Sequence, residues 1–138
     1  MNIEAFCLCN NVSENLFKHV SLHGIFDTIS GPGAFVLSPP MMAIARIRFF
    51  QNELGTYEFD LKASNELGEI LLEETDIVSI STISRDSTVY MMKYIIGKTA
   101  LRFGKYDFSI SHGGQPLART VLYAVQGPPT FQVKIPGV

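Results

Sequence analysis

The sequence predicts an all-β fold, an antiparallel two-sheet β-sandwich of about eight strands. Apolar and polar residues alternate with a period of two over much of the chain, as in strands that bury one face. Clusters of glycine and proline interrupt this alternation at short intervals. Only residues 65–75 are rich in helix formers, and Gly68 interrupts them, so we expect at most one short helical turn there.

The clearest strand signals lie in the middle of the chain and toward its end. In residues 57–64 the apolar side chains alternate strictly with charged or polar ones. Residues 106–111 and 117–125 form two further runs separated by His112-Gly113-Gly114-Gln115, and this spacing predicts a hairpin. The other expected strands are residues 3–10, 16–28, 42–50, 77–84, 89–96 and a short terminal strand at 131–135.

One motif bears on the type of sandwich. The segment Leu101-Arg102-Phe103-Gly104-Lys105-Tyr106 has the L-x-x-G-x-Y spacing of a tyrosine corner. In that device a tyrosine at the start of a strand bonds its hydroxyl to the backbone a few residues upstream. The motif favours an immunoglobulin-like sandwich. A tyrosine that only fills an inward position is the alternative.

Length and composition indicate one globular domain over residues 1–138. A chain of 138 residues buries roughly two thirds of the surface that its unfolded form exposes, so it can fold without disulfides or metals. Hydrophobic residues make up 46% and charged residues 17%, which argues against long disordered segments. No linker divides the chain.

Charge and targeting signals narrow the classes of partner and compartment. Lys and Arg number 11 against 13 Asp and Glu, so the net charge of −2 predicts neither nucleic-acid nor membrane binding. Residues 1–4 lack the basic start of a secretory signal, which predicts a cytoplasmic protein. Cys7 and Cys9, two positions apart on a strand, span a disulfide poorly, so we expect free thiols.

Several segments occur in an order that resembles a known family. They are Gly24-Ile25-Phe26-Asp27-Thr28-Ile29, the Pro39-Pro40 break before a strand, Gly104-Lys105-Tyr106-Asp107-Phe108, and Gly114-Gln115-Pro116-Leu117. The chain resembles a domain-of-unknown-function family of small bacterial sandwich proteins. The resemblance implies a fold and, because its motifs are structural, transfers no catalytic residues. Residues 65–99 carry none of these motifs, so a specialised role there stays open.

The strongest candidate for chemistry is a Cys/His cluster on the first expected hairpin, which would turn around residues 13–15. If Cys9 lies opposite His19, the side chains of Cys7, Cys9, His19 and His23 share one face. Two thiolates and two imidazoles suit a tetrahedral zinc site. Side chains along a flat two-stranded ladder converge poorly on one metal ion. The alternative is that these Cys and His side chains are only small polar groups on a partly covered sheet face. We otherwise expect no cofactor.

No other motif predicts catalysis. The sequence has neither a nucleophile elbow nor a cysteine-protease signature. His112 follows Ser111 in a glycine turn, where a solvated loop residue is more common than a general base. A cluster of acidic residues lies before an expected strand, and a solvated face explains it better than acid/base catalysis. Its members are Glu69, Glu73, Glu74 and Asp76.

These observations leave three functional hypotheses. A non-enzymatic interaction or assembly module is the leading one, because catalytic signatures are absent and apolar surface is in excess. A metal-binding protein or hydrolase that uses the Cys/His cluster is the second. A carbohydrate-binding module is the third, although the sequence contains no tryptophan for the usual sugar platform.

Two segments predict a homodimer. The segment from Val89 to Ile96 is apolar on both faces of its strand, whereas a sandwich strand normally wets one face. Within it Met91 and Met92 supply adaptable apolar contact. In residues 131–135 apolar side chains alternate with Gln132 and Lys134, so this terminal strand could add to a sheet edge. The alternative is that residues 65–75 or the tail cover the strand within one chain.

Overall fold

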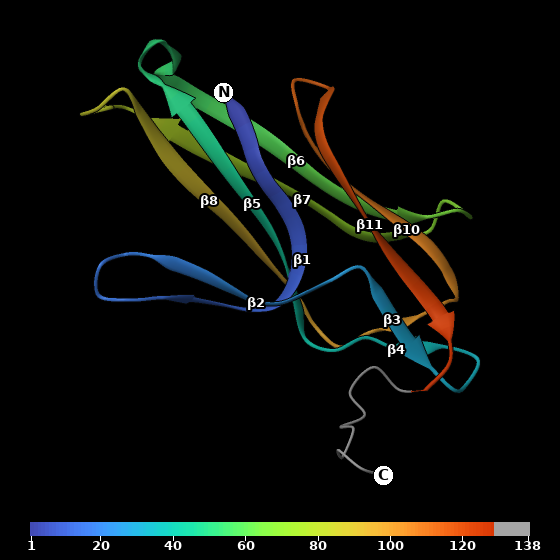
Figure 1. The fold of residues 1–138 in the computed structure, drawn as a ribbon. Coiled ribbons are helices and arrows are strands. Elements are labelled where there is room, and N and C mark those ends of the chain that lie inside the picture. Colours follow the sequence, from blue (N-terminus) through green and yellow to red (C-terminus); the bar gives the residue numbers. More distant parts are fainter. Residues whose placement is uncertain (129–138) are drawn as a thin grey trace.

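The computed structural model describes residues 1–128 (Figure 1). Its strands are β1 (Asn2–Glu14), β2 (Val20–Phe26), β3 (Thr28–Gly31), β4 (Val36–Leu37), β5 (Met41–Phe50), β6 (Gly55–Asn65), β7 (Ile70–Ile80), β8 (Ser87–Ile96), β9 (Ala100–Leu101), β10 (Gly104–His112) and β11 (Gln115–Gln126). One 3₁₀ turn, η1 (Gln51–Glu53), joins β5 to β6. The prediction of an all-β fold is confirmed. The terminal strand expected at residues 131–135 lies outside the described residues.

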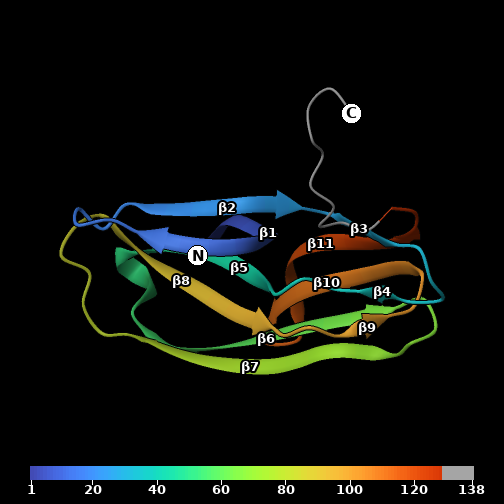
Figure 2. The ribbon, with the colours of Figure 1, turned by 90° about the horizontal axis from the view of Figure 1, so that it is seen from below.

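The described strands form three sheets. The first has the order β2-β1-β5-β8, the second β3-β11-β10-β6-β7, and a small third sheet pairs β4 with β9. In Figure 2, β1 and β2 lie on one side of the molecule and β6 and β7 on the other. No helix in residues 1–128 is long and apolar enough to cross a bilayer.

One pairing departs from the antiparallel prediction, because β3 runs parallel to β11. Only Asp27 separates β2 from β3, so the chain passes directly from the first sheet into the second. The backbone N–H of Tyr123 donates to the Asp27 carbonyl at 2.7 Å and fixes this crossing. β3 therefore enters the second sheet beside β11 in the same direction.

The core lies between the two larger sheets, and both contribute to it. Phe59 and Phe108 from the second sheet are fully buried, as are Ile47 and Phe49 from the first. Burying such a side chain stabilises the fold by about 1.5–3 kcal/mol. Along β6 the predicted alternation is confirmed, because its apolar positions are buried while the charged positions between them are exposed.

Two local predictions are confirmed. The β10–β11 hairpin closes over Gly113 and Gly114, whose φ values of +58° and +79° match the left-handed backbone of a type I′ turn. The Tyr106 hydroxyl donates to the carbonyl oxygen of Arg102 at 3.4 Å, four residues upstream. This is the geometry of a tyrosine corner, and it ties the start of β10 to the preceding loop.

Residues 65–75 were expected to hold at most a helical turn and instead form a tight turn followed by the start of β7. β7 pairs with β6 along its whole length, with a bulge between Ala63 and Ser64. The leucines and glutamates of this segment favour a helix in isolation. Pairing with a neighbouring strand overrides that weak preference.

Candidate interaction surface

β1 and β2 form an arm that leaves the body of the fold. β1 pairs with β5 as far as Cys9, opposite Met42, and beyond that point pairs only with β2. In Figure 1, β1 turns away from β5 and runs out with β2 to a tip clear of the other strands. We call residues 10–24 the arm. Within it only Val12 and Leu22, which lie opposite each other, are partly shielded from solvent.

The arm begins where Gly24 lies beside Asn10. Gly24 has a φ of +64°, a conformation that costs glycine little and other residues much more. A Cβ at this position would lie 2.1 Å from Oδ1 of Asn10, so the Asn10 side chain would have to move to admit one. The bend in β2 therefore requires a glycine.

The turn at residues 15–19 is held by hydrogen bonds to one side chain. Oδ1 of Asn15 accepts the backbone N–H groups of Phe17 at 2.9 Å and His19 at 3.0 Å. Lys18 adopts a left-handed conformation with φ of +61°. Leu16 is 98% exposed and Phe17 79% exposed, so a fixed turn holds two large apolar side chains in water. We call Leu16 and Phe17 the tip.

A second turn, at residues 65–69, has the same construction. Oδ1 of Asn65 accepts the N–H groups of Leu67 at 3.0 Å and Glu69 at 2.9 Å. Gly68, with φ of +79°, takes the place of Lys18, and Leu67 is 75% exposed. This turn joins β6 and β7, which belong to a five-stranded sheet. It therefore provides a matched comparison for the tip.

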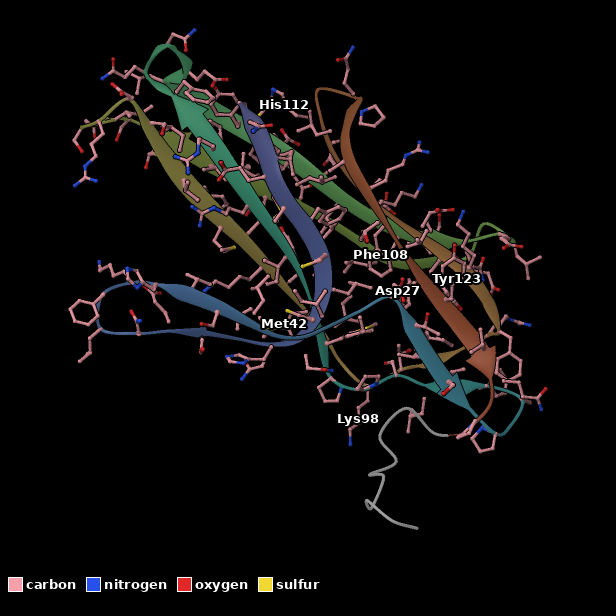
Figure 3. All side chains as sticks on the ribbon, in the orientation of Figure 1. Asp27, Met42, Lys98, Phe108, His112 and Tyr123 are labelled. Atoms are coloured by element: carbon pink, nitrogen blue, oxygen red, sulfur yellow. The ribbon has the colours of Figure 1, made fainter. Side chains whose placement is uncertain are left out.

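An apolar row crosses the outward face of the first sheet at the root of the arm. The strand registers place Ile25, Cys9, Met42 and Ile95 side by side across β2, β1, β5 and β8. Ile25 is 63% exposed and Ile95 77% exposed, while Cys9 between them is fully buried. Figure 3 shows Met42 where β1 and β5 meet the arm. We call Ile25, Met42 and Ile95 the row.

Among the strands of residues 1–128, β8 lies at the edge of its sheet and pairs only with β5. On its outward side Val89 and Met91 are half-buried and lie opposite Arg48 and Arg46. Both arginines bond to Glu4, with Nε–Oε distances of 2.7 Å and 2.9 Å, and these bonds lower the pKa of the Glu4 carboxyl. The outward side of β8 is therefore flanked by charged groups at one end and uncovered at the row.

The structure corrects the predicted register of the first hairpin. Cys9 lies opposite Ile25, six positions beyond His19, because the turn occupies residues 15–19 and not 13–15. A shift by an even number keeps each residue on its face but moves it along the ladder. His19 consequently lies in the turn, with its ring centroid 6.1 Å from that of Phe17.

The other members of the predicted Cys/His cluster have separate surroundings. Nε2 of His23 lies 2.7 Å from Oγ of Ser13, and Cys7 lies on the β5 side of the hairpin opposite Ile44. Cys7 and Cys9 are free thiols, and burial raises the pKa of both. Within residues 1–128 no group of three or more His, Cys, Asp or Glu residues is arranged to hold a metal ion.

His112, at the end of β10, is anchored by its backbone and aromatic neighbours. Nδ1 lies 3.0 Å from the carbonyl oxygen of Glu58, and the ring packs 5.4 Å from Tyr57 and 5.7 Å from Phe59 between centroids. The residue lines an open hollow of about 360 Å³ that also contains Asp60. His112 is therefore the half-buried last residue of β10, and not the solvated loop residue that the sequence suggested.

Comparison with known protein families matches residues 4–125 to the Family of unknown function (DUF6941). The match includes the arm, the row and β8 in full. A comparison with curated proteins found no match. Because the match covers most of the chain, the protein belongs to the family of unknown function DUF6941.

Proposed function

We propose that this chain is a non-enzymatic interaction or assembly module, an immunoglobulin-like β-sandwich of the cytoplasm that forms a homodimer. The observation that carries the proposal is the exposure of Ile95, 77%, on the outward face of an edge strand. Ile95 adjoins further apolar surface in the row. An apolar patch that crosses a sheet to its edge is typical of a protein–protein contact.

The edge itself supports association. β8 is a strand of 10 residues without proline, and only Lys93 carries a charge. Its unpaired backbone groups are a template for another chain, and proteins usually protect such edges with proline, charge or a bulge. A closed two-fold dimer is the commonest way to cover such a surface, and Met42 and Met91 supply adaptable side chains for the contact.

Sedimentation equilibrium at micromolar concentration tests the proposal. We expect wild-type protein at the mass of two chains and Ile95→Lys at the mass of one, because the substitution places a charge in a buried apolar contact. Ile77→Lys is the matched control. Ile77 is 66% exposed on β7, the edge strand of the other large sheet, and its variant should remain dimeric. Wild-type protein at the mass of one chain overturns the proposal.

The terminal segment predicted at residues 131–135 is the other candidate for self-association. Truncation after Gln126 separates the two. A truncated chain that still dimerises, together with a monomeric Ile95→Lys, supports contact through β8. A truncated chain that is monomeric while Ile95→Lys dimerises assigns the contact to the tail.

A further inference from the structure

We propose that two copies exchange arms, so that the tip of each, Leu16 and Phe17, packs on the row of the other. The inference rests on the proposed self-association and names the groups that make the contact.

The tip is preorganised for binding in the single chain. Burial of a Leu or Phe side chain is favourable, and Leu16 is 98% and Phe17 79% exposed in the single chain. The two hydrogen bonds to Asn15 already fix the turn. Docking therefore orders little additional backbone, which is the main cost that weakens contacts made by loops.

The arm lacks support along its length. A two-stranded ribbon is marginally stable in water unless a third strand or a covering layer is added. Within residues 1–128 the arm pairs with no third strand, and of its side chains only Val12 and Leu22 are partly shielded. The outer edge of β2 also leaves backbone groups unpaired, because β2 ends the order of its sheet. A neighbour that lies along the arm supplies the third strand or covering layer that residues 1–128 do not provide.

A second copy fits both ends of the arm at once. The tip lies at one end of the arm and Ile25 of the row at the other, and the chain from Phe17 to Ile25 spans about 26 Å when fully extended. In a two-fold contact, residue i of one copy meets residue j of the other, and j meets i. An axis midway along the arm therefore brings each tip to the other copy's row. One operation covers two tips, two rows and two β2 edges.

Residues of opposite charge lie near the tip and near the row, as this pairing requires. Glu14 beside the tip and Lys93 next to the row are exposed, and neither forms an ion pair within the described part of the chain. Arm exchange brings the carboxylate of one copy toward the ammonium of the other. Such a pair at the rim contributes to orientation and specificity more than to affinity.

Paired variants test the contact by sedimentation equilibrium at micromolar concentration. The tip variant carries Leu16→Ser and Phe17→Ser, and the row variant carries Ile25→Ser and Ile95→Ser. Each should sediment as one chain where the wild type sediments as two. Leu67→Ser is the control, because it removes a leucine that is 75% exposed from a turn of the same construction. All replaced side chains are exposed, so circular dichroism should show an unchanged fold.

Mixing the two monomeric variants gives the most specific result. A heterodimer keeps one intact contact, between the tip of the row variant and the row of the tip variant. We therefore expect a two-chain species in the mixture that neither variant forms alone. Contact of tip with tip, or of row with row, predicts no such recovery, so a mixture that stays monomeric overturns arm exchange.

Further outcomes distinguish a failure of arm exchange from a failure of the proposed self-association. A dimeric tip variant alongside a monomeric Ile95→Lys overturns arm exchange and leaves self-association through β8 standing. A monomeric wild type overturns both. If that monomer binds vesicles of phosphatidylserine and phosphatidylcholine and the tip variant does not, the tip belongs to a membrane contact. Loss of the dimer only on truncation after Gln126, with the tip and row variants still dimeric, assigns the dimer contact to the tail and overturns arm exchange.

Discussion

Asp76 and Tyr90 form a polar contact between the edges of the two larger sheets. Asp76 lies on β7 opposite the buried Phe59, and its Oδ2 accepts the Tyr90 hydroxyl from β8 at 2.7 Å. An inward-pointing charge on an edge strand discourages pairing with a foreign strand. Burial, together with the bond to Asp76, raises the pKa of Tyr90 to about 12.

This pKa predicts how stability depends on alkaline pH. A tyrosine in an unfolded chain titrates near pH 10. The folded value is higher, so the contribution of Tyr90 is full below pH 10 and is lost as pH rises toward 12. Tyr90→Phe should cost about 1–2 kcal/mol at pH 7, because a hydrogen bond to a charged acceptor is lost, and should flatten the alkaline decline. Urea unfolding between pH 7 and 12 measures both effects.

The control for this prediction is Tyr123→Phe, which changes a tyrosine that is 41% exposed on β11. It should preserve the stability at pH 7 and the decline above pH 10. Equal declines in the wild type and Tyr90→Phe would show that the contact between the sheets has no part in the alkaline response.

The surroundings of β8 include residue contacts that could not be predicted from the sequence. The apolar character of the segment from Val89 to Ile96 was visible, and so was its need for a cover. The sequence could not show that Arg46 and Arg48 lie opposite that strand and are drawn together by Glu4. That arrangement depends on pairings between segments about forty residues apart, and local periodicity contains no information on them.

At the scale of elements, Gly24 determines whether the arm can form. Gly24→Ala adds a methyl group where Oδ1 of Asn10 already lies and forces a non-glycine residue to a φ of +64°. We expect a loss of more than about 1 kcal/mol in the stability of the arm. Hydrogen exchange of the amides of Ser13 and Ser21, which pair across the arm, measures it directly.

Gly33→Ala is the matched control for that change. Gly33 has open space around its Cβ position and no left-handed φ, so alanine there should be neutral or slightly stabilising. Equal exchange of the arm amides in the two variants would contradict the requirement for a glycine at the bend.

Among the elements, alternation predicted the strands better than it predicted their partners. β6, β10 and β11 were found with small errors at their ends, because each buries one face and breaks at glycine or a turn. β7 was expected to begin seven residues too late, since its first half is rich in helix formers. The first hairpin was placed six positions out of register, because the hydrogen bonds of Asn15 that set its turn are not visible in a periodicity.

At the scale of the whole molecule, exposed apolar side chains occur on many elements, and the most exposed of them are Leu16 and Phe17 of the tip, at 98% and 79%, and Ile95 of the row, at 77%. The sequence indicated an excess of apolar surface and attributed it to two strands. The exposed residues of the arm were interpreted instead as part of a longer strand, so the tip went unnoticed. A turn with two exposed apolar residues after an asparagine is the signal that would have found it.

The rate at which a reagent labels the thiols measures how well the folded molecule protects its cysteines. Cys9 lies between the members of the row and is fully buried. The thiolate is the reactive form, and burial raises the pKa of Cys7 and Cys9, so both are less reactive than an ordinary cysteine at pH 8. In native protein we expect a thiol reagent to react at least about tenfold more slowly than in urea. In urea without reductant it should modify two thiols per chain.

The same measurement also senses the proposed dimer. Arm exchange covers the row, so labelling of wild-type protein should slow further as its concentration rises through the dissociation constant. The tip variant, which keeps both cysteines, should label at a rate independent of concentration. Native labelling as fast as in urea would contradict the burial of Cys9, and fewer than two modified thiols in urea would contradict the free state of the pair. A wild-type rate that ignores concentration while the protein sediments as a dimer would place the interface away from the row.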